Sequence, residues 1–225
     1  MRSGRRRPDV LDAVLFDLDG TITDPEVGIT GSFRRAMADV GHPVADDVDL
    51  RWMIGPTLAE SLDRVGLPTD LHQAVIDGYR AHLRAEGLRQ AELVAGMPEV
   101  IDGLRADGVR LALASAKMID MGETTLRHVG LLDRFELVAG CLPDGAVRTK
   151  GQIVGDALAG LGGPDPGHVA MVGDRRHDIE GARQHGCLAV AVEWGFAEPG
   201  ELDRAAPDRI VATPAELLTV LRALP

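Results

Sequence analysis

Two aspartates follow the first apolar run of the chain at a spacing that suits chemistry. The run Ala13–Phe16 is short and hydrophobic, and it leads directly into Asp17 and Asp19. A run of this kind is typical of a buried strand in a parallel sheet. Two carboxylates so close together repel each other unless a cation or a shared proton intervenes. The pair therefore indicates a site that holds positive charge.

Three further polar residues stand at the ends of similar elements. Ser115 and Asp174 each follow an apolar run, and Lys150 stands at the start of a predicted helix. Because ligands of open parallel sheets bind at the carboxyl ends of the strands, we expect these side chains to meet Asp17 and Asp19 at one edge. Taken singly, Ser115 and Asp174 also fit helix caps, and Lys150 fits a surface cation.

The carboxylates indicate metal-assisted phosphoryl chemistry. Asp17, Asp19 and Asp174 could together hold Mg²⁺, which prefers oxygen ligands. Asp17 would then attack phosphorus and form an aspartyl-phosphate. Asp19 would protonate the leaving oxygen and later take a proton from water.

The remaining polar residues suit the phosphoryl group itself. Ser115 and Lys150 would hold its equatorial oxygens. Gly20 would let the backbone turn closely enough for amides to point at the phosphate.

Composition excludes several classes of function. The chain has 225 residues, 45% of them hydrophobic, and a net charge of −11. The negative charge argues against a nucleic-acid polymer as partner, and no run approaches the length of a membrane-spanning helix. Two distant cysteines, Cys141 and Cys187, fit no metal site and favour a reduced, cytoplasmic protein. Of the 24 basic residues only Lys117 and Lys150 are lysine. This imbalance reflects either a genome rich in G and C or positions that arginine cannot fill.

Predicted strands and helices alternate over most of the chain, which indicates a parallel sheet covered on both faces. The strands are expected near 12–17, 109–114, 136–139, 168–172, 187–192 and 209–211, and the helices between and after them near 98–107, 119–129, 151–161, 179–185 and 214–224. Residues 25–94 break this rhythm with helical patterns and no convincing strand. They are interpreted as a helical insertion into an α/β core.

The motifs resemble those of the haloacid dehalogenase superfamily. The first motif of that family, DxDGT, is similar to residues 17–21, and its fourth, GDxxxD, is similar to residues 173–178. Ser115 and Lys150 resemble the second and third motifs. The order is that of the family, and the resemblance spans residue 11 to about 223.

The resemblance implies an α/β fold with a Rossmann-like parallel sheet core and an inserted α-helical cap domain. Its core would comprise residues 10–24 and 95–225, and its cap residues 25–94. Separately, the basic residues 1–9 are interpreted as a disordered tail. The implied metal ligands are the carboxylates of Asp17 and Asp174 and the backbone carbonyl of Asp19. Asp178 would either support them or be an exposed aspartate in the first turn of a helix.

The resemblance also narrows the reaction. Asp19 favours ester hydrolysis, because relatives that cleave carbon–halogen or carbon–phosphorus bonds generally lack a carboxylate there. Phosphoglycolate phosphatase-like enzymes share the layout, and residues 54–61 are similar to a bacterial 5′-nucleotidase-like branch, which often has arginine in place of Ala59. In that stretch Gly55 and Thr57 are either cap contacts to substrate or a plain turn. Lys117, two residues after Ser115, could reach the phosphate, but it is expected to be a surface lysine in the first turn of a helix.

We therefore expect a magnesium-dependent phosphatase, a phosphoric monoester hydrolase acting on a small phosphorylated metabolite as a monomer or dimer. A sugar phosphomutase, which uses the same core and the same aspartate pair, is the nearest competing enzyme. A phospho-receiver module and a non-catalytic binding protein on the same scaffold are competing functions of other classes. Receivers, however, are shorter and have no helical insertion.

Overall fold

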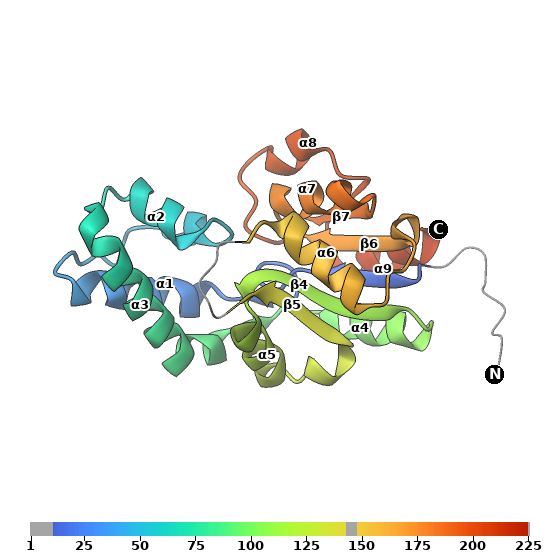
Figure 1. Cartoon of the computed structure of the whole chain (residues 1–225), viewed down its shortest axis with the longest axis horizontal. Coiled ribbons are helices and arrows are strands. Elements are labelled where there is room, and N and C mark those ends of the chain that lie inside the picture. The colour runs from blue at the N-terminus through green and yellow to red at the C-terminus, as the bar shows by residue number, and fades with distance from the viewer. Residues whose placement is uncertain (1–10, 143–147, 225) are drawn as a thin grey trace.

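A parallel sheet forms the centre of the molecule in the computed structural model, which describes residues 11–142 and 148–224 (Figure 1). Its strands are β1 (Ala13–Phe16), β4 (Arg110–Met118), β5 (Leu137–Cys141), β6 (Val169–Gly173), β7 (Leu188–Val192) and β8 (Arg209–Val211), in the order β5-β4-β1-β6-β7-β8. The expected α/β fold with a Rossmann-like sheet is confirmed. The basic tail expected at residues 1–9 lies outside the described residues.

Strand β1 is buried on both faces because helices cover each side of the sheet. Val14 and Phe16 pack in one apolar cluster, and Ala13 and Leu15 pack in another. This is the twofold alternation of a strand. The first cluster includes residues of α4 (Met97–Ala106), α5 (Ile119–His128) and α9 (Pro214–Ala223). The second includes residues of α6 (Lys150–Gly160), α7 (Arg176–His185) and α8 (Glu201–Ala205).

The insertion between β1 and β4 consists mainly of helices, and its apolar cluster also includes Met121 of α5. Helices α1 (Glu26–Asp39), α2 (Leu58–Arg64) and α3 (Thr69–Ala85) pack around residues such as Phe33, Leu62 and Val75. Short 3₁₀ turns lie at Arg51–Met53, Gly87–Gln90, Leu132–Arg134 and Pro166–His168. In Figure 1 the helices α1, α2 and α3 form the left-hand lobe, beyond the end of the sheet.

A two-stranded antiparallel ribbon joins the lobe to the core. It pairs β2 (Thr23–Asp24) with β3 (Glu92–Leu93), so the chain leaves and re-enters the core at adjacent points. No strand was expected within residues 25–94, and β3 corrects that expectation. Two residues per strand are too few for a periodic pattern to be recognised.

The register of the sheet sets the position of the site. Phe16 pairs with Leu113 on one side and with Val172 on the other. The residues that follow these three positions therefore emerge side by side at the edge that faces the helical lobe. This edge carries Asp17, Ser115 and Asp174.

Candidate active site

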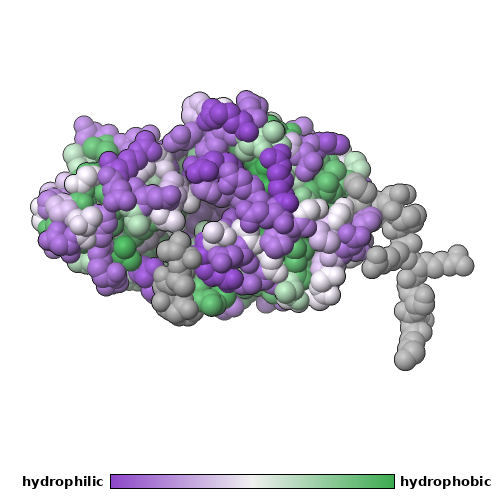
Figure 2. Space-filling view, turned by 45° about the horizontal axis from the view of Figure 1, so that its top comes forward, coloured by the Kyte–Doolittle hydropathy of each residue, from purple (hydrophilic) through white to green (hydrophobic). Residues whose placement is uncertain are grey.

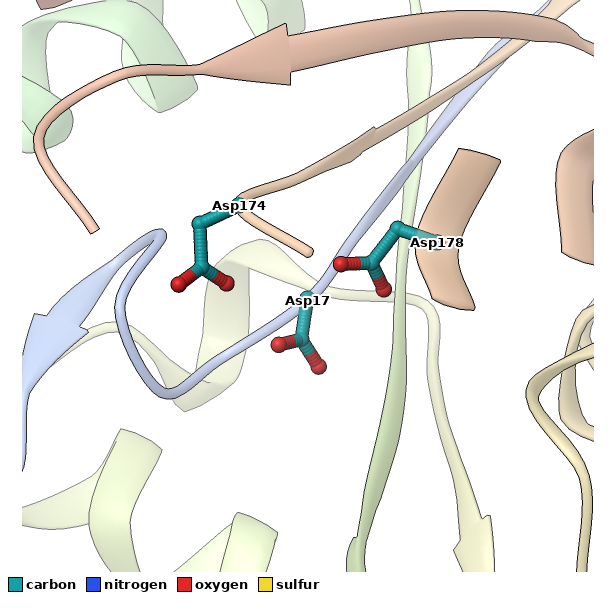
Figure 3. A group of neighbouring side chains, drawn as sticks. All are labelled: Asp17, Asp174 and Asp178. Carbon is teal, nitrogen blue, oxygen red and sulfur yellow. The ribbon is translucent and has the colours of Figure 1, made fainter. Parts of the chain in front are cut away.

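Three carboxylates converge where β1 and β6 end. Asp17, Asp174 and Asp178 each offer an oxygen that lies within 4.8 Å of the others (Figure 3). Asp17 follows β1, and its amide donates to the carbonyl of Val172 at 2.9 Å. Asp174 follows β6, and Asp178 lies in the first turn of α7. Oxygen ligands in this arrangement suit a hard divalent cation such as Mg²⁺.

Asp174 is a buried carboxylate with one oxygen left without a hydrogen-bond partner among the described residues. It is only 1% exposed, and its Oδ2 accepts the amide of Phe196 at 2.7 Å. Its buried Oδ1 has no hydrogen-bond partner among the described residues. Burial, followed by repulsion from Asp178 and Asp17, raises the pKa of Asp174 well above its ordinary value. A metal ion at this position would satisfy the orphaned oxygen, so the residues present fit Mg²⁺.

Lys150 forms ion pairs with the other two carboxylates. Its Nζ lies 2.7 Å from Asp17 Oδ1 and 2.7 Å from Asp178 Oδ1. Burial opposes the ammonium charge, but Asp17 and Asp178 outweigh it and raise the pKa of Lys150. Thr149 caps α6 through the amide of Gln152, which fixes Lys150 as the first residue of that helix.

Asp178 is buried, so the alternative of an exposed aspartate was wrong. Its side chain is 4% exposed, and its Oδ2 accepts the amide of Arg175 at 3.0 Å. Burial raises the pKa of Asp178 to about 6, although Lys150 opposes the shift. Its contact with Lys150 gives it the supporting position that the sequence left open.

Lys117 is not a surface residue, which corrects the expectation from the sequence. Its side chain is 7% exposed, and its Nζ lies 2.8 and 2.7 Å from the two carboxylate oxygens of Asp19. The strand β4 continues through Lys117 to Met118 with a register shift after Ala114, whereas the sequence suggested a helix there. Burial raises the pKa of Asp19, and Lys117 partly offsets this shift.

Gly20 and Ser115 lie beside this cluster. Gly20 has φ +85°, and a Cβ atom on it would lie 2.4 Å from Asp174 Oδ2. Its own amide donates to the carbonyl of Thr23 at 2.7 Å, so any amide aimed at a phosphate belongs to a neighbouring residue. Ser115 is 4% exposed, and its hydroxyl accepts the amide of Lys117 at 3.3 Å.

The two candidate cap residues contact other partners. Thr57 is exposed and caps α2 by accepting the amide of Glu60 at 3.2 Å. Gly55 lies against the guanidinium of Arg175. Their contacts to substrate stay predictions.

Two residues that sequence reasoning missed also face the site. Tyr79 projects from α3 of the helical lobe, and burial, with the charge of Asp19, raises the pKa of its hydroxyl. Arg175 follows Asp174 directly. The helical pattern of α3 offered no sign that the charge of Asp19 acts on Tyr79, because that effect depends on how the lobe sits on the core.

A family model described as haloacid dehalogenase-like hydrolase matches residues 14–192. The chain is 38% identical over 209 residues to a Mycobacterium tuberculosis protein named tyrosine-protein kinase PtkA, covering 93% of this chain and 70% of that protein. It is 32% identical over 209 residues to a Pseudomonas aeruginosa 5′-nucleotidase, covering 92% of this chain and 94% of that one. A phosphoglycolate phosphatase of Caulobacter vibrioides is 31% identical over 195 residues, which cover 82% of this chain and 80% of that enzyme.

The fold is similar to solved structures over nearly its whole length. A predicted phosphatase from Clostridium acetobutylicum superposes with a TM-score of 0.87 at 29% identity, covering 94% of this chain and 98% of that one. Among the described helices, none is long and apolar enough to cross a lipid bilayer.

Replacing Asp174 by asparagine should stabilise the metal-free protein and remove its response to Mg²⁺. The amide oxygen of asparagine can still accept from Phe196, while the repulsion from Asp17 and Asp178 is lost. In EDTA we expect a Tm higher by about 2–4 °C, the response of a chain of this size to about 1 kcal/mol.

Thermal unfolding with and without millimolar Mg²⁺ checks this expectation. Mg²⁺ should raise the Tm of the wild type and leave that of the variant unchanged. A variant that is less stable than the wild type in EDTA would contradict the charge argument.

Proposed function

Since the chain belongs to the haloacid dehalogenase-like hydrolase family, we propose that it is a magnesium-dependent phosphatase that cleaves a small phosphomonoester through an aspartyl-phosphate on Asp17. The observation that carries the proposal is the state of the Asp17 carboxylate. Lys150 binds its Oδ1 at 2.7 Å, and no described residue donates a hydrogen bond to its Oδ2. One oxygen is therefore fixed, and the other is available to attack phosphorus.

Asp17 and Asp19 divide the bond-making and proton-transfer steps between them. Attack by Asp17 forms a bond to phosphorus as the ester P–O bond breaks, and Asp19 gives its proton to the leaving oxygen. Water then attacks the same phosphorus, passes a proton to Asp19 and releases Asp17. Burial raises the pKa of Asp19, against the opposing charge of Lys117, and a raised pKa suits a carboxyl group that donates a proton.

The phosphoryl oxygens would be bound by Lys150, Ser115 and the backbone turn at Gly20. Lys150 supplies a buried positive charge next to Asp17, and Ser115 lies on the neighbouring strand β4, two residues beyond the partner of Phe16. Donors held in place before the reaction stabilise developing charge without reorganisation.

Mg²⁺ would be held by the carboxylates of Asp17 and Asp174 and by the backbone carbonyl of Asp19. The orphaned Oδ1 of Asp174 supports this assignment. The bound ion would reduce the repulsion between the Asp17 carboxylate and a phosphate dianion. Asp178 supports the group by holding Lys150 in place.

A small phosphorylated metabolite is the substrate class that the phosphatase relatives support. The relatives named 5′-nucleotidase and phosphoglycolate phosphatase support a nucleotide or phosphoglycolate as substrate. We assign residues 25–94 to a cap over residues 10–24 and 95–225, with Gly55 and Thr57 on its loop as candidate substrate contacts. Neither the monomeric nor the dimeric state conflicts with this site, and a cytoplasmic location suits its substrates.

Two other reactions use similar chemistry. The mycobacterial relative named a tyrosine kinase favours phosphoryl transfer to protein as the second candidate, and a sugar phosphomutase is the competing enzyme on the same core. A panel of phosphomonoesters with Mg²⁺ should give steady release of inorganic phosphate. Transfer of a labelled phosphoryl group from ATP to a protein tyrosine would instead favour the kinase reaction. Isomerisation of a sugar phosphate without phosphate release would favour the mutase.

Asp17→Asn should abolish turnover and leave the fold intact, because an amide cannot attack phosphorus. Removal of a nucleophile costs orders of magnitude in rate, so we expect less than about 1% of wild-type kcat. Phosphate release measures activity, and circular dichroism verifies the fold. Higher residual activity would exclude the covalent route.

Replacing either lysine by arginine, which keeps the charge, should impair catalysis. A guanidinium is larger than an ammonium and spreads its charge, and each ammonium here is buried in contact with carboxylates. We expect Lys150→Arg and Lys117→Arg each to lower kcat/KM by about tenfold or more, since one lost transition-state contact costs about 10²–10³.

The exposed Arg105→Lys is the matched control, and it should keep wild-type rates. If both arginine variants are as active as the wild type, the two lysines reflect only the composition of the chain.

A further inference from the structure

A buried arginine joins the helical lobe to the core beside the carboxylate cluster. Arg175 is 8% exposed, and its Nη1 donates a hydrogen bond to the backbone carbonyl of Ile54 in the lobe. Its Nε lies 3.0 Å from Glu201 Oε1 in the core. We call the contacts of Arg175 with Ile54 and Glu201 the Arg175 bridge. One guanidinium thus reaches a lobe residue 121 positions away in sequence.

Glu201 fixes the direction of the guanidinium. It is 6% exposed, and its carboxylate also accepts the amides of Arg176 and Glu198, both at 2.9 Å. A carboxylate held by two amides cannot follow a moving partner. Because the fork of arginine is planar and rigid, fixing Nε also fixes where Nη1 points.

The lobe is shaped to receive this side chain. Gly55 has φ +109°, and a Cβ on it would lie 2.2 Å from Arg175 Nη1. Ile54 is 1% exposed and belongs to the apolar cluster of the lobe, so its carbonyl is held by packed residues. Glycine is required at this point because the guanidinium lies directly against the backbone.

Other polar contacts between lobe and core are more exposed. Arg84 and Asp120 lie 3.2 Å apart with 41% and 54% of their side chains exposed, and Arg64 and Glu198 lie 3.6 Å apart with more than half of each exposed. Exposed ion pairs contribute little to holding two surfaces together. A buried, charge-assisted hydrogen bond contributes more.

The Arg175 bridge lies at the edge of an open cavity between lobe and core. The cavity measures about 520 Å³, and its lining includes Trp52, Arg64, Arg175 and His177. In Figure 2 the surface is hollowed between the helical lobe and the core, and hydrophilic side chains gather around the hollow. Apolar packing around Met121 of α5 also joins the lobe to the core, and the Arg175 bridge adds a buried polar contact at the edge of this cavity.

We propose that Arg175 is a positioning residue that docks the helical lobe over the strand ends, so that the side chains of the lobe face Asp17 and Asp19. The inference rests on the proposed function for its kinetic consequence. The backbone amide of Arg175 also donates to Asp178, and Asp174 precedes it. The position of the lobe is therefore set from within the segment that forms the cluster.

Two variants break the Arg175 bridge from opposite sides. The double variant Arg175→Met/Glu201→Gln removes both charges, so that no unpaired charge stays buried, and the side-chain carbonyl of the new glutamine can still accept a backbone amide. Gly55→Ala changes only the lobe, where its methyl group displaces the guanidinium and the φ of +109° strains the loop. Arg84→Met is the control, because it removes an exposed lobe–core contact elsewhere on the lobe.

We expect KM for a hydrolysed phosphomonoester to rise about tenfold in both bridge variants and by less than about twofold in Arg84→Met. Loss of folded enzyme would lower the measured kcat and leave KM unchanged, so a rise in KM separates positioning from a structural defect. If the double variant fails to fold by circular dichroism, the quenching of Trp52 in Gly55→Ala decides, because Gly55 is itself a candidate substrate contact.

Acrylamide quenching of Trp52 provides a readout that needs no activity. Trp52 lines the cavity, and Trp194→Phe, introduced in every protein, leaves Trp52 as the single tryptophan. Quenching should increase in both bridge variants and stay at the parent value in Arg84→Met. Parent KM and parent quenching in a folded bridge variant would overturn the proposal. If the wild type releases no phosphate from any ester, the proposed function fails, and quenching alone still decides on the Arg175 bridge.

Discussion

The concentration of negative charge at one edge of the sheet is the constraint to which the rest of the site responds. Asp17, Asp174 and Asp178 bring oxygens within 4.8 Å of one another, and Asp19 stands next to them on the same turn as Asp17. Such a group is stable only if positive charge reaches it from elsewhere. Each aspartate of the β1 turn accordingly has a lysine, with Lys117 on Asp19 and Lys150 on Asp17. No cationic side chain of the described residues forms an ion pair with Asp174, which is the reason why a metal fits there.

The positive charges come from segments that are distant in sequence. Local structure fixes where each of these segments begins or ends, and so places its charged residue at the site. Lys150 lies 133 residues from Asp17 in sequence, and the capped start of α6 places it against the end of β1. Asp178 is likewise set by the start of α7. Close approach also requires small residues, since a Cβ on Gly20 or Gly195 would lie within 2.4 Å of Asp174 Oδ2.

The long elements could be predicted well from the sequence, and the contacts between them less well. The strands around Val14 and Val172 have continuous apolar runs, so the sheet and the residues at its ends could be predicted. Lys117 was misplaced because a register shift carries β4 past Ser115, and no propensity indicates such a shift. The contact of Arg175 with Ile54 could not be inferred, because it depends on how the lobe is placed on the core.

Lysine and arginine serve two different kinds of contact in this protein. Both lysines are buried point charges held by carboxylates, with side chains 7% exposed. Arg175 instead joins a carboxylate to a backbone carbonyl on another part of the chain, which requires several donors in fixed directions. An ammonium at Arg175 could satisfy Glu201 without reaching Ile54, and a guanidinium at Lys150 would need space that Asp17 and Asp178 already fill. A bias toward arginine in the whole chain therefore leaves lysine at the positions where a compact charge is required.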